Sequence, residues 1–94
     1  MNDGNKIQYE IRVTGRVQGV GFRYYVQQQA KLLNVTGWVR NTVDGGVMVL
    51  AQGSEQAVKT LVDYLWVGPP LSLVKSVHTA ELHVIESYTH FEVR

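Results

Sequence analysis

Three glycines within the seven residues Gly15-Arg16-Val17-Gln18-Gly19-Val20-Gly21 form the segment of this sequence whose composition most clearly suggests chemistry. Successive amides in a glycine-rich turn can point inward and form a nest that binds an anion. The segment runs into a predicted helix start, where free N–H groups and the helix dipole also favour negative charge. Arg23, at the second position of that helix, offers a planar fork that matches two phosphate oxygens. The segment therefore predicts a site for a phosphate-sized anion.

The same segment lacks groups that other kinds of phosphate chemistry need. Residues 15–23 contain no Ser, Thr or Cys nucleophile and no Asp or Glu to hold magnesium. They match neither the P-loop pattern nor the dinucleotide-binding Gly-x-Gly-x-x-Gly pattern. Such a site can position a substrate and neutralise charge, but it has no evident general acid. It suits a substrate whose leaving group departs without a proton, such as an acyl phosphate, which releases a carboxylate.

The hydrophobic pattern predicts the elements that must position this segment. Alternation of apolar residues predicts strands, and apolar stripes at helical spacing predict helices. The resulting order is β-α-β-β-α-β with a short extra C-terminal strand, which is typical of an α+β, ferredoxin-like sandwich with two helices on one face of an antiparallel sheet. The predicted elements are strand 7–14, helix 22–33 or 22–34, strand 36–43, an Asp44-Gly45 turn, strand 47–52, a helix from Ser54 to Gly68, edge strand 77–85 and strand 89–94.

This topology brings Asn41 to the glycine-rich segment. In it the first and third strands lie side by side in the centre, and the second strand lies beyond the third. The right-handed crossover through the first helix makes the first and second strands parallel, so both end at the same edge of the sheet. Their axes are about 9–10 Å apart. Alternation puts Asn41 on the face of Val39 and Val43, opposite Trp38 and Arg40. The loop amides can therefore come within one small ligand of Asn41.

Composition limits the other possibilities. The 94 residues are 45% apolar and 18% charged, which predicts one globular domain over residues 7–94 after a flexible tail at 1–6. The absence of cysteine excludes disulfides and thiolate sites. A net charge of +1 argues against nucleic acid as a partner. The longest apolar run, Val47–Ala51, is far shorter than a membrane helix. We expect a cytoplasmic monomer that has no membrane partner.

The motifs also resemble those of a known family. Gly15–Arg23 closely resembles the signature loop of the acylphosphatases, and Gly37–Asn41, followed by Asp44-Gly45, resembles that family's second signature. Gly68–Ser72 and Phe91–Arg94 are similar to its later segments, so the resemblance spans about residues 7–94. It implies a ferredoxin-like fold and the hydrolysis of acyl phosphates to a carboxylate and inorganic phosphate, without metal or cofactor.

The resemblance also implies roles for individual residues. Arg23 would bind the phosphate of a small acyl phosphate, and Asn41 would hold the attacking water. Inorganic phosphate would be both product and inhibitor. Met48 departs from the family pattern, which often has Glu there, and we expect this to affect stability or surface pairing rather than chemistry. The amides that would join Arg23 on the phosphate are those of Gln18, Gly19, Val20, Gly21, Phe22 and Arg23 itself.

Other interpretations of the residues stay open at this point. A single-stranded RNA-binding module shares the element order, and residues 19–24 faintly resemble an aromatic RNA motif. A non-catalytic anion-binding domain on the same fold would keep the same loop. His78 and His83 are expected to point to opposite faces of a strand, which argues against a metal site. The two tryptophans and five tyrosines are expected to be core and packing residues, and a second interpretation of Tyr24 and Tyr25 is that they line a mouth for the acyl group.

Overall fold

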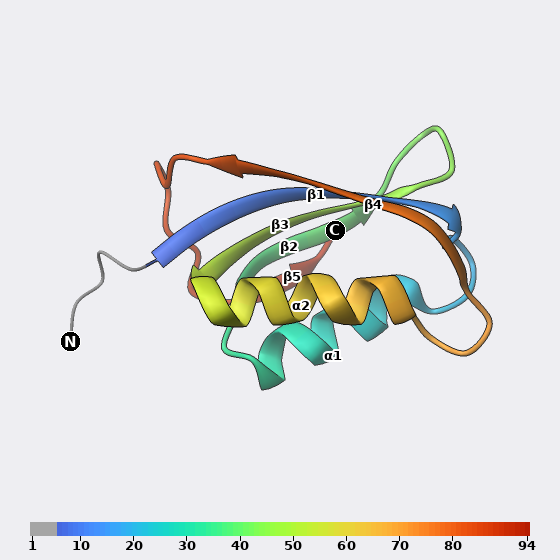
Figure 1. The fold of residues 1–94 in the computed structure, drawn as a ribbon, viewed down its shortest axis with the longest axis horizontal. Coiled ribbons are helices and arrows are strands. Elements are labelled where there is room, and N and C mark those ends of the chain that lie inside the picture. The colour runs from blue at the N-terminus through green and yellow to red at the C-terminus, as the bar shows by residue number, and fades with distance from the viewer. Residues whose placement is uncertain (1–5) are drawn as a thin grey trace.

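The chain alternates strands and helices in the predicted order (Figure 1). The computed structural model describes residues 6–94. The predicted tail at 1–6 lies outside these residues, except for Lys6, which begins the first strand. The elements are β1 (Lys6–Arg16), α1 (Phe22–Leu32), β2 (Thr36–Asn41), β3 (Val47–Ser54), α2 (Glu55–Val67), β4 (Leu73–Leu82) and β5 (Phe91–Val93).

The five strands form one sheet in the order β4-β1-β3-β2-β5, and both helices cover the same face (Figure 1). The predicted ferredoxin-like α+β fold is confirmed, with β1 and β3 side by side and β2 beyond β3. The short last strand pairs with β2 in parallel, so the sheet is mixed rather than antiparallel throughout. The parallel β1 and β2 end at the edge where the glycine-rich segment leaves β1.

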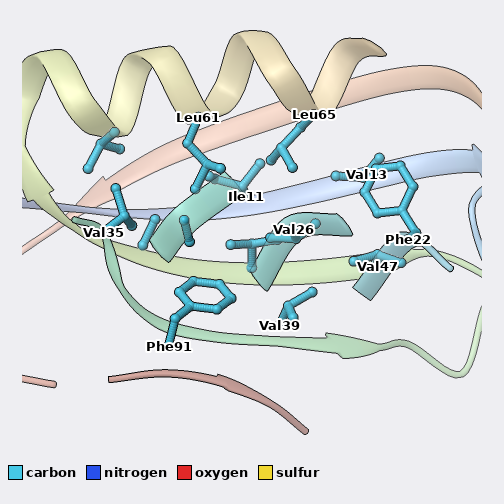
Figure 2. Packing of buried hydrophobic residues seen from close by; sticks show 14 of the residues in the cluster. Ile11, Val13, Phe22, Val26, Val35, Val39, Val47, Leu61, Leu65 and Phe91 are labelled. Atoms are coloured by element: carbon cyan, nitrogen blue, oxygen red, sulfur yellow. The ribbon is translucent and has the colours of Figure 1, made fainter. Parts of the chain in front are cut away.

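The core lies between the sheet and the two helices (Figure 2). Leu61 and Leu65 of α2 and Val26 of α1 point toward Ile11 of β1, and all four are fully buried. Ser54 caps α2 as predicted, because its Oγ accepts from the N–H of Ala57 at 3.1 Å. The helical stripes in the sequence are therefore the faces that hold the helices to the sheet. Not all aromatic residues belong to this core: Tyr24, Tyr64 and Trp66 are exposed, by 66%, 42% and 50%, so the expectation of a core position was wrong for these three.

Two strands have different bounds from those predicted. β2 ends at Asn41 rather than at residue 43, because Thr42 N–H donates to the Gly46 carbonyl and the chain turns there. Val43 is fully exposed in this turn and shares no strand face with Asn41. β4 spans 73–82 instead of 77–85, because an irregularity at Thr14/Gly15 lets β1 continue pairing with it.

Beyond β4, residues 83–88 are tied to the outer face of the sheet by two buried glutamines. Gln52 Nε2 donates to Gln8 Oε1 at 2.6 Å and to the Glu86 carbonyl at 2.5 Å. Gln8 Nε2 donates to the His83 carbonyl at 3.0 Å. These hydrogen bonds hold residues 83–88 against the sheet, so β4 does not continue to residue 85. Met48 is also buried on this outer face, where its cross-strand neighbours are Arg12 and Arg40.

Gly37 belongs to the second motif, and a substitution there tests whether this motif also contains residues that are needed for the stability of the fold. An added Cβ there would overlap the backbone carbonyl of Leu50 in β3. Gly37→Ala is therefore expected to lower the free energy of unfolding by more than about 2 kcal/mol, as measured by chemical denaturation. Gly53→Ala is the control, since its Cβ would meet only ordinary contacts from 3.5 Å. Equal stability of the two variants would contradict this account of Gly37.

Candidate active site

The segment between β1 and α1 curls so that its amides stay free. Gly19 and Gly21 have φ values of 75° and 80°, a left-handed conformation that glycine adopts at little cost. Gly21 precedes α1, and no side chain caps that helix end. Within residues 6–94, the N–H groups of residues 18–23 donate no hydrogen bond to a protein acceptor. The loop therefore offers unused donors at a helix N-terminus, as an anion site requires.

A pocket of about 280 Å³ joins this loop to the end of β2. Its polar groups include Arg23 and Asn41, which the sequence predicted at one sheet edge. No carboxylate lines the pocket. The pocket is lined by Val17, Gly19, Gly21, Phe22, Arg23, Tyr24, Asn41 and Val93.

Asn41 brings an unused acceptor to the same pocket. Its Oδ1 is buried and accepts no hydrogen bond from the protein, and it is the one such buried side-chain atom in the described part of the chain. A buried polar group left without a partner costs about 1–3 kcal/mol. A water or substrate atom that donates to Oδ1 would remove this cost, so the asparagine is suited to holding such a donor.

Arg23 is held near the pocket by the last strand. Its Nη1 donates to the main-chain oxygen of Arg94 at 3.1 Å. The Arg94 N–H donates in turn to the Val39 carbonyl at 2.7 Å, and its guanidinium lies over the Trp38 ring, 5.3 Å from the centroid. One donor of Arg23 is thus fixed on the protein, while a guanidinium has five. Sequence reasoning missed Arg94 as a partner, because a main-chain oxygen leaves no signal in residue type.

Gln18 contributes a side chain as well as a backbone amide. Its Nε2 donates to the carbonyls of Thr42 and Gly46, both at 2.8 Å. The sequence predicted only an amide of the phosphate-binding loop at this position. The side chain instead links that loop to the hairpin that follows Asn41.

The hairpin is closed by hydrogen bonds within the turn itself. The Thr42 hydroxyl donates to Asp44 Oδ1, and the Gly46 N–H donates to Thr42 Oγ1 at 3.0 Å and to Asp44 Oδ1 at 3.4 Å. The hydrogen bond from Thr42 has the largest effect on Asp44, and the one from the Gly46 N–H comes next. Both stabilise the carboxylate and so lower the pKa of Asp44 below its ordinary value of 3.8.

The histidines considered as metal ligands lie outside this pocket. His78 and His83 are exposed, and residues 6–94 contain no group of three or more potential metal ligands among His, Asp and Glu side chains. None of the helices within these residues has the length and apolar character to cross a membrane.

Comparison with known proteins gives the pocket its context. The family model described as Acylphosphatase matches residues 9–93. The chain belongs to the acylphosphatase family. The activity of this family is the hydrolysis of acyl phosphates, and the chain is an enzyme of this kind. The RNA-binding and non-catalytic alternatives are therefore set aside, and the segment considered for RNA lies in a loop and a helix start, not in a central strand.

Similarity to individual acylphosphatases extends over almost the whole chain. The chain is 42% identical over 87 residues to the acylphosphatase of Bacillus subtilis, covering 93% of this chain and 96% of that protein. It is 49% identical over 82 residues to that of Bifidobacterium longum, covering 87% and 84%. The acylphosphatase structure from Coxiella burnetii superposes with a TM-score of 0.93 at 38% identity, covering all of both chains.

The hairpin predicts a measurable titration. We expect the pKa of Asp44, followed by carboxyl NMR shifts, to lie below 3.8 and to rise toward it in Thr42→Val. Thr42→Ser keeps the hydroxyl and is the control. The pKa of Asp44 is lower in the folded state than in the unfolded state. The contribution of its hydrogen bonds to the free energy of unfolding is therefore fully present above the unfolded-state pKa and is lost as pH falls through the folded-state pKa. An unchanged Asp44 pKa in Thr42→Val would contradict the assignment of the hydroxyl.

Proposed function

We propose that this acylphosphatase hydrolyses its substrate in the pocket between the loop and Asn41. Arg23 and the amides of residues 18–23 bind the phosphoryl group, and Asn41 holds the attacking water. The observation that carries the proposal is the pairing of unused groups around one pocket. Free donors lie on the loop side, and an unpartnered acceptor lies on the other.

The donors fit the charge of the transition state. Phosphoryl transfer spreads negative charge over three equatorial oxygens, and its catalysis is mostly positioning and electrostatic stabilisation. The loop amides are already oriented by Gly19 and Gly21, so little reorganisation is needed when charge develops. Arg23 keeps Nη1 on the Arg94 main-chain oxygen and turns its remaining donors to the phosphoryl oxygens.

The acceptor fits the nucleophile. Water donates one hydrogen to Asn41 Oδ1, which aims an oxygen lone pair at phosphorus in line with the leaving group. The new O–P bond forms as the bond between phosphorus and the acyl oxygen breaks, and the carboxylate leaves with the electron pair. A proton of the attacking water passes to a phosphoryl oxygen of the substrate. The products are a carboxylate and inorganic phosphate, and the step uses no side-chain acid or base.

The acyl group would lie at the mouth of the pocket, against Tyr24 and Val93. Both residues line the pocket and both are exposed, Tyr24 by 66%. Neither side chain carries a charge, and Val93 is wholly apolar, so together they distinguish acyl groups weakly. The pocket therefore selects the phosphate more strictly than the acyl portion. The cytoplasmic location and the monomeric state stay predictions from the sequence.

Substitution of the two pocket side chains should separate binding from turnover. Arg23→Gln should lower kcat/KM for benzoyl phosphate by at least about 10³-fold and abolish competitive inhibition by inorganic phosphate. Asn41→Ala should lower kcat by about 10²-fold while phosphate still inhibits, because the loop donors remain. Arg40→Gln, on the outer face of the sheet, is the control and should stay within about 2-fold of the parent. Near-normal turnover by Asn41→Ala would refute the water-holding role.

The mouth of the pocket gives a further expectation. Tyr24→Ala should raise KM for benzoyl phosphate by about 5-fold and leave acetyl phosphate unchanged, because only the aromatic acyl group loses a stacking partner. Tyr64→Ala, another exposed tyrosine, is the control. Equal changes for both substrates would place the acyl group elsewhere.

A further inference from the structure

We propose that the Gln18 side chain is a positioning residue, which sets the distance between the phosphate-binding loop and the water held by Asn41. The inference rests on the proposed function and assigns a role to a side chain that does not itself bind substrate. Within residues 6–94, it concerns the one side chain that hydrogen-bonds the phosphate-binding loop directly to the hairpin after Asn41.

The register of the sheet shows why the loop needs such a link. β1 pairs with the central strand β3 only as far as Val13, which lies opposite Val47. From there β1 continues along β4 to Arg16, on the side away from β2. The loop therefore starts from a strand that has already separated from β3 and from the hairpin after Asn41. Backbone pairing alone does not bring it back.

The Gln18 amide closes this gap. Its Nε2 reaches across to the carbonyls of Thr42 and Gly46, at 2.8 Å each. In the described part of the chain, no other hydrogen bond joins residues 17–21 to residues 42–46. Thr42 directly follows Asn41, so the contact fixes the loop relative to the residue beside the attacking water.

The chemistry of the contact explains why the residue is glutamine. A primary amide carries two N–H donors on one nitrogen, and here each meets a separate carbonyl. Both donors are used, so Nε2 has none left for a phosphate. A carboxylate at this position would set an acceptor oxygen against the two carbonyl oxygens, with no hydrogen to donate. The side chain of asparagine would be one methylene too short to reach them. The side chain thus acts on the reaction through Asn41 and the loop, not by contact with substrate.

A positioning role predicts a loss in turnover with little loss in binding. A displacement of about 1 Å in a reacting group can cost about 10²-fold in rate. Gln18→Met keeps similar length and volume but removes both donors. We expect it to lower kcat for benzoyl phosphate by about 10–100-fold, while the inhibition constant of inorganic phosphate changes by less than about 3-fold.

Gln27 offers a matched control. It lies on α1, and its Nε2 donates to the Phe91 carbonyl at 3.1 Å, away from the pocket. Gln27→Met removes the same kind of hydrogen bond and should leave kcat unchanged. Comparable losses in Gln18→Met and Gln27→Met would overturn the proposal, because they would show a general effect on the fold.

A double-mutant cycle tests whether Gln18 acts through Asn41. In an Asn41→Ala background, Gln18→Met should change kcat by less than about 2-fold, since there is no longer a held water to misplace. If the kcat losses of the two single variants instead multiply in the double variant, the positioning role is overturned. If Asn41→Ala loses turnover but Gln18→Met keeps it, only the inference about Gln18 fails. If Asn41→Ala itself keeps turnover, the water-holding step of the proposed function fails.

Gln18→Glu provides a second route if Gln18→Met does not fold. Its carboxylate cannot donate to either carbonyl, but the protonated acid can donate to one. The kcat of this variant relative to the parent should therefore rise as pH falls through the pKa of the new carboxyl. A constant ratio over that range would count against the hydrogen bonds as the cause.

Discussion

The site depends on a short stretch of backbone that folds without using its own donors. A buried N–H group normally finds a partner, because leaving it unpaired costs free energy. The amides of residues 18–23 donate to no acceptor in the described chain, and four residues of this stretch line the pocket at the start of α1: Gly19, Gly21, Phe22 and Arg23. Burial of Val17 before the loop and Phe22 after it anchors the stretch on both sides. Packing of these flanking residues holds the stretch between β1 and α1, and in the proposed function an oxyanion accepts from its amides beside Arg23.

Topology supplies the second half of the site. β3 lies between β1 and β2, so the loop and Asn41 face each other across one strand at the same edge. Their polarities are opposite: the loop offers hydrogens, whereas Asn41 offers a buried oxygen without a partner. An anion is attracted to the first and a water to the second. In the proposed function, these two groups, neither of which has a partner within the protein, set where phosphorus and its nucleophile meet.

Sequence patterns predicted these placements because both arise from local rules. The change from alternating to helical periodicity at Phe22 located the start of α1, and the element order brought Asn41 to the loop. The hydrogen bond of Arg23 to the Arg94 main-chain oxygen could not be predicted, because any residue type supplies a main-chain oxygen. The bounds of β4 were missed for a related reason. Its earlier start depends on an irregularity at Thr14/Gly15, and its earlier end depends on two buried glutamines that hold the residues after Leu82. These are properties of paired strands and not of one strand.

The residues of a signature motif need not share one role. An added Cβ at Gly15 would overlap the carbonyl of Leu73, so this glycine lets β4 approach β1. Gly19 and Gly21 have open space around a Cβ, and for them it is the left-handed backbone that matters. The Gln18 side chain donates to two carbonyls of the hairpin that follows Asn41. The motif therefore combines a sheet contact, a side-chain bridge and a run of free amides, and in the proposed function only the amides contact phosphate. A match to the motif indicates the chemistry because the first two parts are what hold the nest open.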